Sequence, residues 1–167
     1  ADQPLTPVMT DAFVVGAEFF CGVCNPLYPP FQNFPQWELL PLENAADGFQ
    51  PVMDTLIING VEVVYVQGQL ASSTLLTYLS DQNIKVVGDA APDVLRNNWV
   101  GTVAKDPGPA LIELWPDILQ GTAAVQVPSS ITLRDTNAGL ITEGRLRVFE
   151  EMADKLEAGL VSPETNP

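Results

Sequence analysis

The sequence predicts an α/β fold, with three αβα layers around a mostly parallel, doubly wound sheet. Short segments rich in β-branched and aromatic residues alternate with segments whose apolar residues recur every three or four positions. The connections between them are short, and this alternation is typical of parallel strands joined by helices. A length of 167 residues suits one domain with a sizeable core.

The elements follow from these two periodicities. The predicted strands are residues 13–18, 37–42, 61–66, 84–87, 99–104 and 125–133. The predicted helices are residues 45–59, 72–82, 108–119 and 143–158. Thr142 is a candidate N-cap, and Gly60, Gly121 and Gly159 are candidate helix stops. Pro116 is expected to bend or shorten the helix over residues 108–119.

Composition at the two ends predicts the domain limits. Residues 1–11 are rich in Pro and Thr and are expected to form a linker, and residues 162–167 are expected to form a tail. Residues 12–161 then make a single α/β lobe.

Charge excludes several function classes. The chain has 7 Lys and Arg against 21 Asp and Glu, a net charge of −14, and no His. It therefore has little with which to neutralise phosphates, which argues against a nucleic-acid partner. It also lacks the usual general base at neutral pH and the commonest metal ligand. We expect a binding protein without catalytic residues, metal or cofactor. Few Lys among many acids suits an extracytoplasmic location.

The two cysteines, Cys21 and Cys24, form a CxxC motif after the apolar stretch 13–20. A CxxC directly after a strand is the arrangement of thioredoxin-like oxidoreductases, in which a following helix lowers the pKa of the thiol. Three prolines within residues 26–30 disfavour that helix. The other interpretation is a loop that holds a local disulfide or two buried thiols.

Polar residues follow the predicted strands, at the edge where parallel sheets bind ligands. The candidate ligand-binding residues are Glu18, Phe19, Gln67, Gly68, Gln69, Asp89 and Lys105. Gln69 and Asp89 can bind a pair of hydroxyl groups, and Lys105 is one of only three Lys in the chain. The alternative for each is a solvated loop residue or a helix cap.

From Asn59 onward, the order of segments resembles the C-terminal lobe of type 1 periplasmic binding proteins. The nearest family looks like the basic membrane lipoprotein (BMP) family. The similar segments are NGVEVVYVQG (59–68), NIKVVGD (83–89), GTVAKD (101–106), DTNAGL (135–140) and GRLR (144–147). The resemblance covers roughly two-thirds of the chain.

This resemblance implies a substrate-binding subunit of an ABC importer, held in the periplasm or anchored at the cell surface as a lipoprotein. Its ligand would be a small polar solute, nucleoside-like or sugar-like, bound at the positions of Gly68, Asp89 and Lys105. Family members have two lobes, so a second lobe or an ABC permease is an expected partner.

Two alternatives stay open. One is a thioredoxin-like thiol-disulfide oxidoreductase that uses Cys21 and Cys24. The other is a non-catalytic interaction module that forms a homodimer, through the aromatic and Pro-rich stretch 27–37 or through the last helix.

Overall fold

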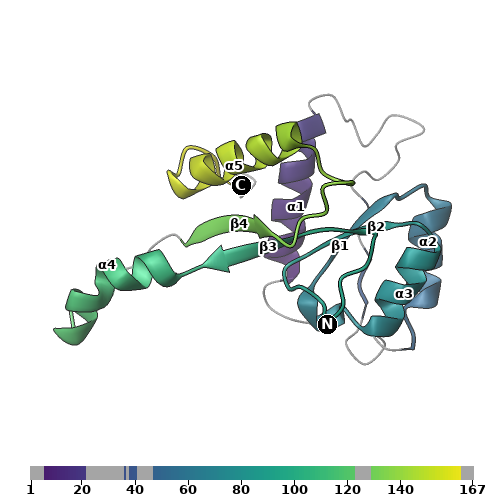
Figure 1. The fold of residues 1–167 in the computed structure, drawn as a ribbon, viewed down its shortest axis with the longest axis horizontal. Coiled ribbons are helices and arrows are strands. Elements are labelled where there is room, and N and C mark those ends of the chain that lie inside the picture. Colours follow the sequence, from purple (N-terminus) through teal and green to yellow (C-terminus); the bar gives the residue numbers. More distant parts are fainter. Residues whose placement is uncertain (1–5, 22–35, 37, 41–46, 123–128, 163–167) are drawn as a thin grey trace. The chain divides into compact units, whose positions relative to one another are not determined.

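The computed structural model describes residues 6–21, 36, 38–40, 47–122 and 129–162. It is a mixed α/β structure with a mostly parallel four-stranded sheet, which confirms the predicted α/β class and the mostly parallel sheet (Figure 1). Its contacts divide the chain into two units. The first comprises residues 1–64, 69–85 and 162–167, and the second comprises residues 65–68 and 86–161.

Between residues 61 and 122, and in the last helix, the elements match the predicted ones within two residues. The helix predicted over residues 45–59 begins only at Gln50, and of the strand predicted over residues 125–133 the structure describes Ser130–Arg134. The helices are α1 (Thr6–Cys21), α2 (Gln50–Ile58), α3 (Ser73–Asp81), α4 (Gly108–Leu119) and α5 (Glu143–Glu157), with the 3-10 turn η2 (Gly68–Leu70). The strands are β1 (Val63–Val66), β2 (Lys85–Gly88), β3 (Trp99–Asp106) and β4 (Ser130–Arg134), in the sheet order β1-β2-β3-β4. Helix α4 has the predicted bounds and continues past Pro116, which therefore does not shorten it.

The N-terminal prediction is wrong. Thr6–Cys21 forms helix α1, where a strand was expected over residues 13–18, and the helix begins inside the stretch expected to be a linker. A short apolar run fits a buried strand or a buried helix equally well, and here the helix also takes in polar Thr10 and Asp11. Of the predicted strand 37–42, residues 38–40 lie in no regular element and the others are outside the described residues.

The helices end where the sequence predicts. After α2, Gly60 has φ +83°, which a glycine adopts without steric cost. Its N–H donates to the carbonyl of Ile57 at 2.9 Å, and that of Val61 donates to Leu56 at 3.1 Å. This pair of hydrogen bonds is a Schellman motif, and the same pattern follows α4 and α5. At the start of α5, the Thr142 hydroxyl accepts a hydrogen bond from the N–H of Arg145.

In the first unit, α2 packs against α3. Phe49 and Tyr78 meet edge to face, with ring centroids 5.5 Å apart, and the Tyr78 hydroxyl donates to the carboxylate of Asp54. Leu75 and Leu79 of α3 are fully buried beside them. The apolar face of α3 therefore forms the centre of this core.

In the second unit, β3 pairs in parallel with β2, although residues 89–98 between them contain no helix. The register runs from Val86 opposite Trp99 to Gly88 opposite Thr102, with an irregularity after Val86. The Trp99 ring is 2% exposed and lies on Gly88, where a Cβ atom would be 2.6 Å from the ring. Its indole N–H donates to the buried hydroxyl of Thr102 at 3.3 Å.

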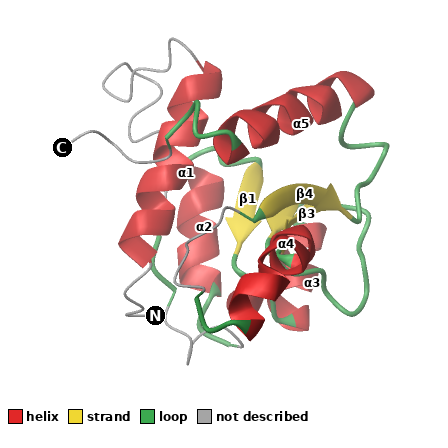
Figure 2. Ribbon diagram, turned by 90° about the vertical axis from the view of Figure 1, so that its left-hand side faces the viewer, coloured by secondary structure: helices red, strands yellow, loops and turns green. Residues whose placement is uncertain are grey.

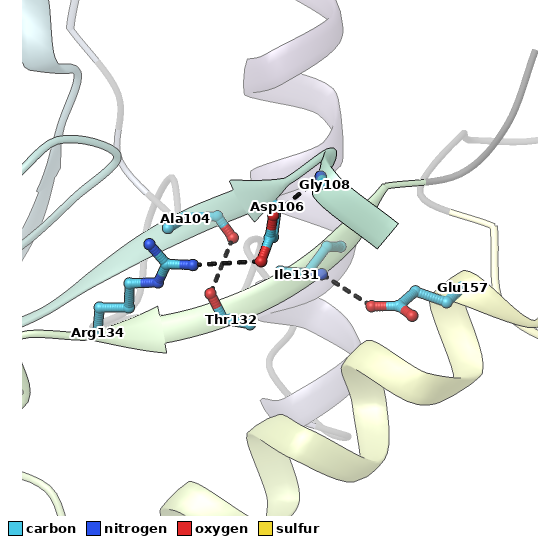
Figure 3. A network of polar contacts seen from close by, with 7 residues as sticks. All are labelled: Ala104, Asp106, Gly108, Ile131, Thr132, Arg134 and Glu157. Atoms are coloured by element: carbon cyan, nitrogen blue, oxygen red, sulfur yellow. Dashed lines mark hydrogen bonds and ion pairs between the residues drawn. The ribbon is translucent and has the colours of Figure 1, made fainter. Parts of the chain in front are cut away.

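Strand β4 pairs with β3 antiparallel (Figure 3). Asp106 ends β3 and forms an ion pair with Arg134 at 3.5 Å, while its other oxygen accepts the N–H of Gly108 at the start of α4. On the other side of β4, the N–H of Ile131 donates to the carboxylate of Glu157 at 2.8 Å. Because β4 is an edge strand, Glu157 satisfies a backbone group that would otherwise be open to another strand.

The core of the first unit makes a testable prediction. Replacing Leu79 by Ala leaves a cavity at a site that is 0% exposed. We expect a loss of about 2–5 kcal/mol in the free energy of unfolding, measured by urea denaturation. The control, Leu95→Ala, removes the same atoms from an exposed leucine and should change stability by no more than about 0.5 kcal/mol. Equal effects of the two variants would contradict the assignment of this core.

Candidate functional site

The structure brings together two of the predicted ligand-binding residues, Gly68 and Asp89. Gly68 begins the turn after β1, and Asp89 directly follows β2. The N–H of Gly68 donates to Oδ1 of Asp89 at 2.5 Å. Both residues belong to the second unit. This hydrogen bond fixes the orientation of a carboxylate that remains exposed at the edge of the sheet.

Gly68 has no room for a side chain. A Cβ atom built there would lie 2.7 Å from the Cβ of Ala90 and 3.1 Å from Oδ1 of Asp89. The two chain segments therefore approach each other through small residues. The glycine predicted as part of a ligand-binding loop is required at least for this close approach.

Tyr65 of β1 is a third member of the site and was not among the residues predicted from the sequence. Burial, and next the negative charge of Asp89, raise the pKa of the Tyr65 phenol from 10.0 to about 12. A tyrosine phenol is neutral at physiological pH in any case, and the raised pKa keeps that of Tyr65 neutral to higher pH. The sequence contained one sign of this residue: Tyr65 is the single tyrosine in an otherwise aliphatic strand, near the carboxyl end at which parallel sheets bind ligands.

This arrangement favours recognition of hydroxyl groups. An exposed carboxylate accepts hydrogen bonds from two adjacent hydroxyls, as in a ribose or another sugar, and its charge strengthens these bonds. The side chain of Tyr65 adds an aromatic ring near this carboxylate, whose charge is, after burial, the second cause of the raised Tyr65 pKa. Within the described ranges, no group of three or more Cys, Asp or Glu side chains is placed to hold a metal ion.

The other predicted residues of the sheet edge take different positions. Gln67 is half-buried in the same loop, and Gln69 begins the segment assigned to the first unit. Lys105 is exposed on β3. Gly88, the residue before Asp89, lies opposite Thr102 of β3, and Lys105 is three residues, or about 10 Å, further along that strand. No contact between Lys105 and Asp89 occurs in the described part of the chain.

The N-terminal candidates were chosen because a strand was predicted over residues 13–18, and that strand is absent from the described structure. Glu18 and Phe19 lie in α1 and not at the end of a strand, and the described structure does not extend to their side chains. Cys21 is the last residue of α1, so the CxxC motif follows a helix and not a strand. Cys24 lies outside the described residues.

A surface hollow occurs elsewhere, on α2 and α3 in the first unit (Figure 2 shows both helices). Its volume is about 360 Å³, and it is open to solvent. Its walls are formed by Phe49, Gln50, Ser73, Thr74, Thr77, Tyr78 and Asp81. The hollow presents hydroxyl groups from one face of α3, whereas Asp89 lies at the end of a strand.

The strand order also differs from the one that usually marks a ligand site. In doubly wound sheets the ligand lies where the order of strands reverses. The four described strands follow one another in chain order without a reversal. The site at Gly68 and Asp89 therefore depends on its own contacts and not on a topological switch point.

Comparison with known proteins adds no assignment, since no protein-family model and no curated protein matches this sequence. None of the helices in the described ranges combines the length and hydropathy needed to cross a bilayer.

The raised pKa of Tyr65 gives a prediction at alkaline pH. The folded chain holds this proton more tightly than the unfolded chain, whose tyrosine titrates near pH 10. The resulting stabilisation is complete below pH 10 and is lost as the pH rises towards about 12. In Asp89→Asn, the Tyr65 midpoint should fall but stay above 10, because burial is the larger cause. The midpoint of Tyr65 is measured in the wild-type and in the Asp89→Asn protein from tyrosinate absorbance, after subtracting the absorbance of the same protein with Tyr65→Phe. An unchanged midpoint in Asp89→Asn would exclude an influence of Asp89.

The close approach at Gly68 gives a second prediction. Gly68→Ala inserts a methyl group against Ala90 and should lower the free energy of unfolding by about 1–3 kcal/mol in urea denaturation. Removing the opposing methyl in the double variant Gly68→Ala/Ala90→Gly should restore part of this loss. Simple addition of the two single effects would show that the residues do not touch.

Proposed function

We propose that this chain is the solute-binding lobe of an extracytoplasmic, BMP-type substrate-binding protein that serves an ABC importer. Its ligand is a small polar solute with adjacent hydroxyl groups, nucleoside-like or sugar-like. The observation that carries the proposal is the exposed Asp89 carboxylate, held by the N–H of Gly68 where β1 and β2 end.

Binding uses the lone pairs of Asp89 that Gly68 does not occupy. Two hydroxyl groups of the solute donate to this carboxylate, and these charge-assisted bonds are stronger than neutral ones. The hydrogen bond from Gly68 removes part of the ordering cost, because the carboxylate is oriented before the solute arrives. The proposal is for binding without catalysis, since the chain has no His to act as a base at neutral pH.

The exposure of Asp89 also supports the proposal that a second lobe covers this site. Strong sites bury most of a small ligand, whereas this carboxylate stands open at one edge of the sheet. In the proposed function a second lobe covers the bound solute, and an ABC permease receives it. This single lobe should therefore bind its solute weakly by itself.

The geometry does not favour the thioredoxin-like alternative. That activity requires a cysteine at the N-terminal end of a helix, where the positive end of the helix dipole lowers the pKa of the thiol. Cys21 is instead the last residue of α1, next to the negative end of its dipole. We therefore keep solute binding as the proposed function.

Isothermal titration of the whole chain with adenosine, ribose and glucose tests the proposal. We expect at least one of them to bind. Asp89→Asn should weaken that binding roughly 10-fold to 100-fold, because bonds to a charged group are worth about 1.5–3 kcal/mol. The matched control is Asp93→Asn, which removes the same charge from an exposed residue of the same loop. No binding, or an equal loss in both variants, would refute the proposed site.

A further inference from the structure

Helix α4 carries five large apolar side chains that face solvent: Leu111, Ile112, Trp115, Ile118 and Leu119, here called the α4 stripe. Their exposed fractions range from 41% for Ile118 to 78% for Ile112. No residue of α4 is buried by the described part of the chain. Helix α4 belongs to the second unit together with β3 and β4, and Figure 1 shows it extending beyond the ends of these two strands.

The α4 stripe is one continuous surface. At 3.6 residues per turn, its five positions fall within an arc of about 120° on one side of the helix. The two charged residues of α4, Glu113 and Asp117, fall on the opposite side. Residues 111, 115 and 118 form one row along the helix, and residues 112, 115 and 119 form an adjacent row that shares Trp115. Rows with this spacing of three and four residues are the ridges through which helices pack against each other.

We propose that the α4 stripe is a homodimer interface, on which a second copy of this chain packs its own α4. The exposed area of the five side chains is on the order of 600 Å² per copy, since a large apolar side chain carries roughly 150–250 Å². Two copies then bury on the order of 1,200 Å², which is the lower end of the range for stable interfaces.

Charge decides between a second copy and other occupants. A basic protein surface would be attracted by carboxylates beside the stripe, but Glu113 and Asp117 point away from it. An anionic membrane would meet a helix without Lys or Arg. Two copies of an uncharged stripe meet without placing carboxylates opposite each other, and a two-fold axis requires only that the surface complement itself. Trp115, near the middle of the stripe, is the type of residue that anchors interfaces.

The net charge determines how this dimer responds to salt. Each copy carries −14, so the two repel each other as they approach. Salt screens this repulsion and leaves the apolar contact intact. The dimer should therefore become tighter as the salt concentration rises, whereas an interface built from ion pairs would become weaker.

Sedimentation equilibrium of the whole chain, over a range of concentrations at low and at moderate NaCl, tests the proposal. We expect a concentration-dependent dimer that tightens with salt, and at least tenfold weaker association in Ile112→Gln. Ile58→Gln is the matched control, because Ile58 is 83% exposed at the end of α2 and should leave the dimer unchanged. If Ile112→Gln loses its helical circular dichroism, Leu119→Gln replaces it.

Each other outcome overturns the proposal. A monomer at every concentration would show that no second copy covers the stripe. A dimer that persists in both stripe variants would place the interface elsewhere, for example on the stretch 27–37 or on α5. A dimer that weakens with salt would show that ion pairs form the contact.

Discussion

The packing of Trp99 on Gly88 is the contact on which the second unit depends. Residues 89–98 connect β2 to β3 without a helix, so no crossover element holds these parallel strands together. The indole ring adds a side-chain contact to their sheet pairing: it is almost wholly buried, lies where a side chain of residue 88 would stand, and donates to Thr102 on its own strand. A glycine at the end of β2 is therefore a packing requirement.

The same contact determines where the candidate site lies. Gly88 is the last residue of β2, and Asp89 is the next residue along the chain. The segment that follows approaches the turn after β1 so closely that Gly68 has no room for a side chain beside Ala90. The backbone of Gly68 then orients the carboxylate, while the solvent-facing side of Asp89 stays open. Close packing of small residues thus leaves one oriented carboxylate exposed at the edge of the sheet.

The sequence predicted the elements whose ends have a specific chemical cause. Gly60, Gly121 and Gly159 stop helices because the motif after each helix needs a positive φ, and Thr142 caps α5 through its hydroxyl. The helix α1 was missed because a short apolar run has no period that separates strand from helix. The antiparallel direction of β4 was missed because it depends on contacts with β3 far along the chain.

Gly68 and Asp89 were found from strand ends, whereas Tyr65 acts through burial, which the sequence does not display.

The central claim is that the ends of β1 and β2 form one solute site. Amide chemical-shift mapping of the whole ¹⁵N-labelled chain, on addition of the solute that binds, tests it most directly. We expect the amides of Gly68, Asp89 and Ala90 to shift together and to saturate with one dissociation constant. Shifts confined to the hollow on α2 and α3, or to α4, would contradict it.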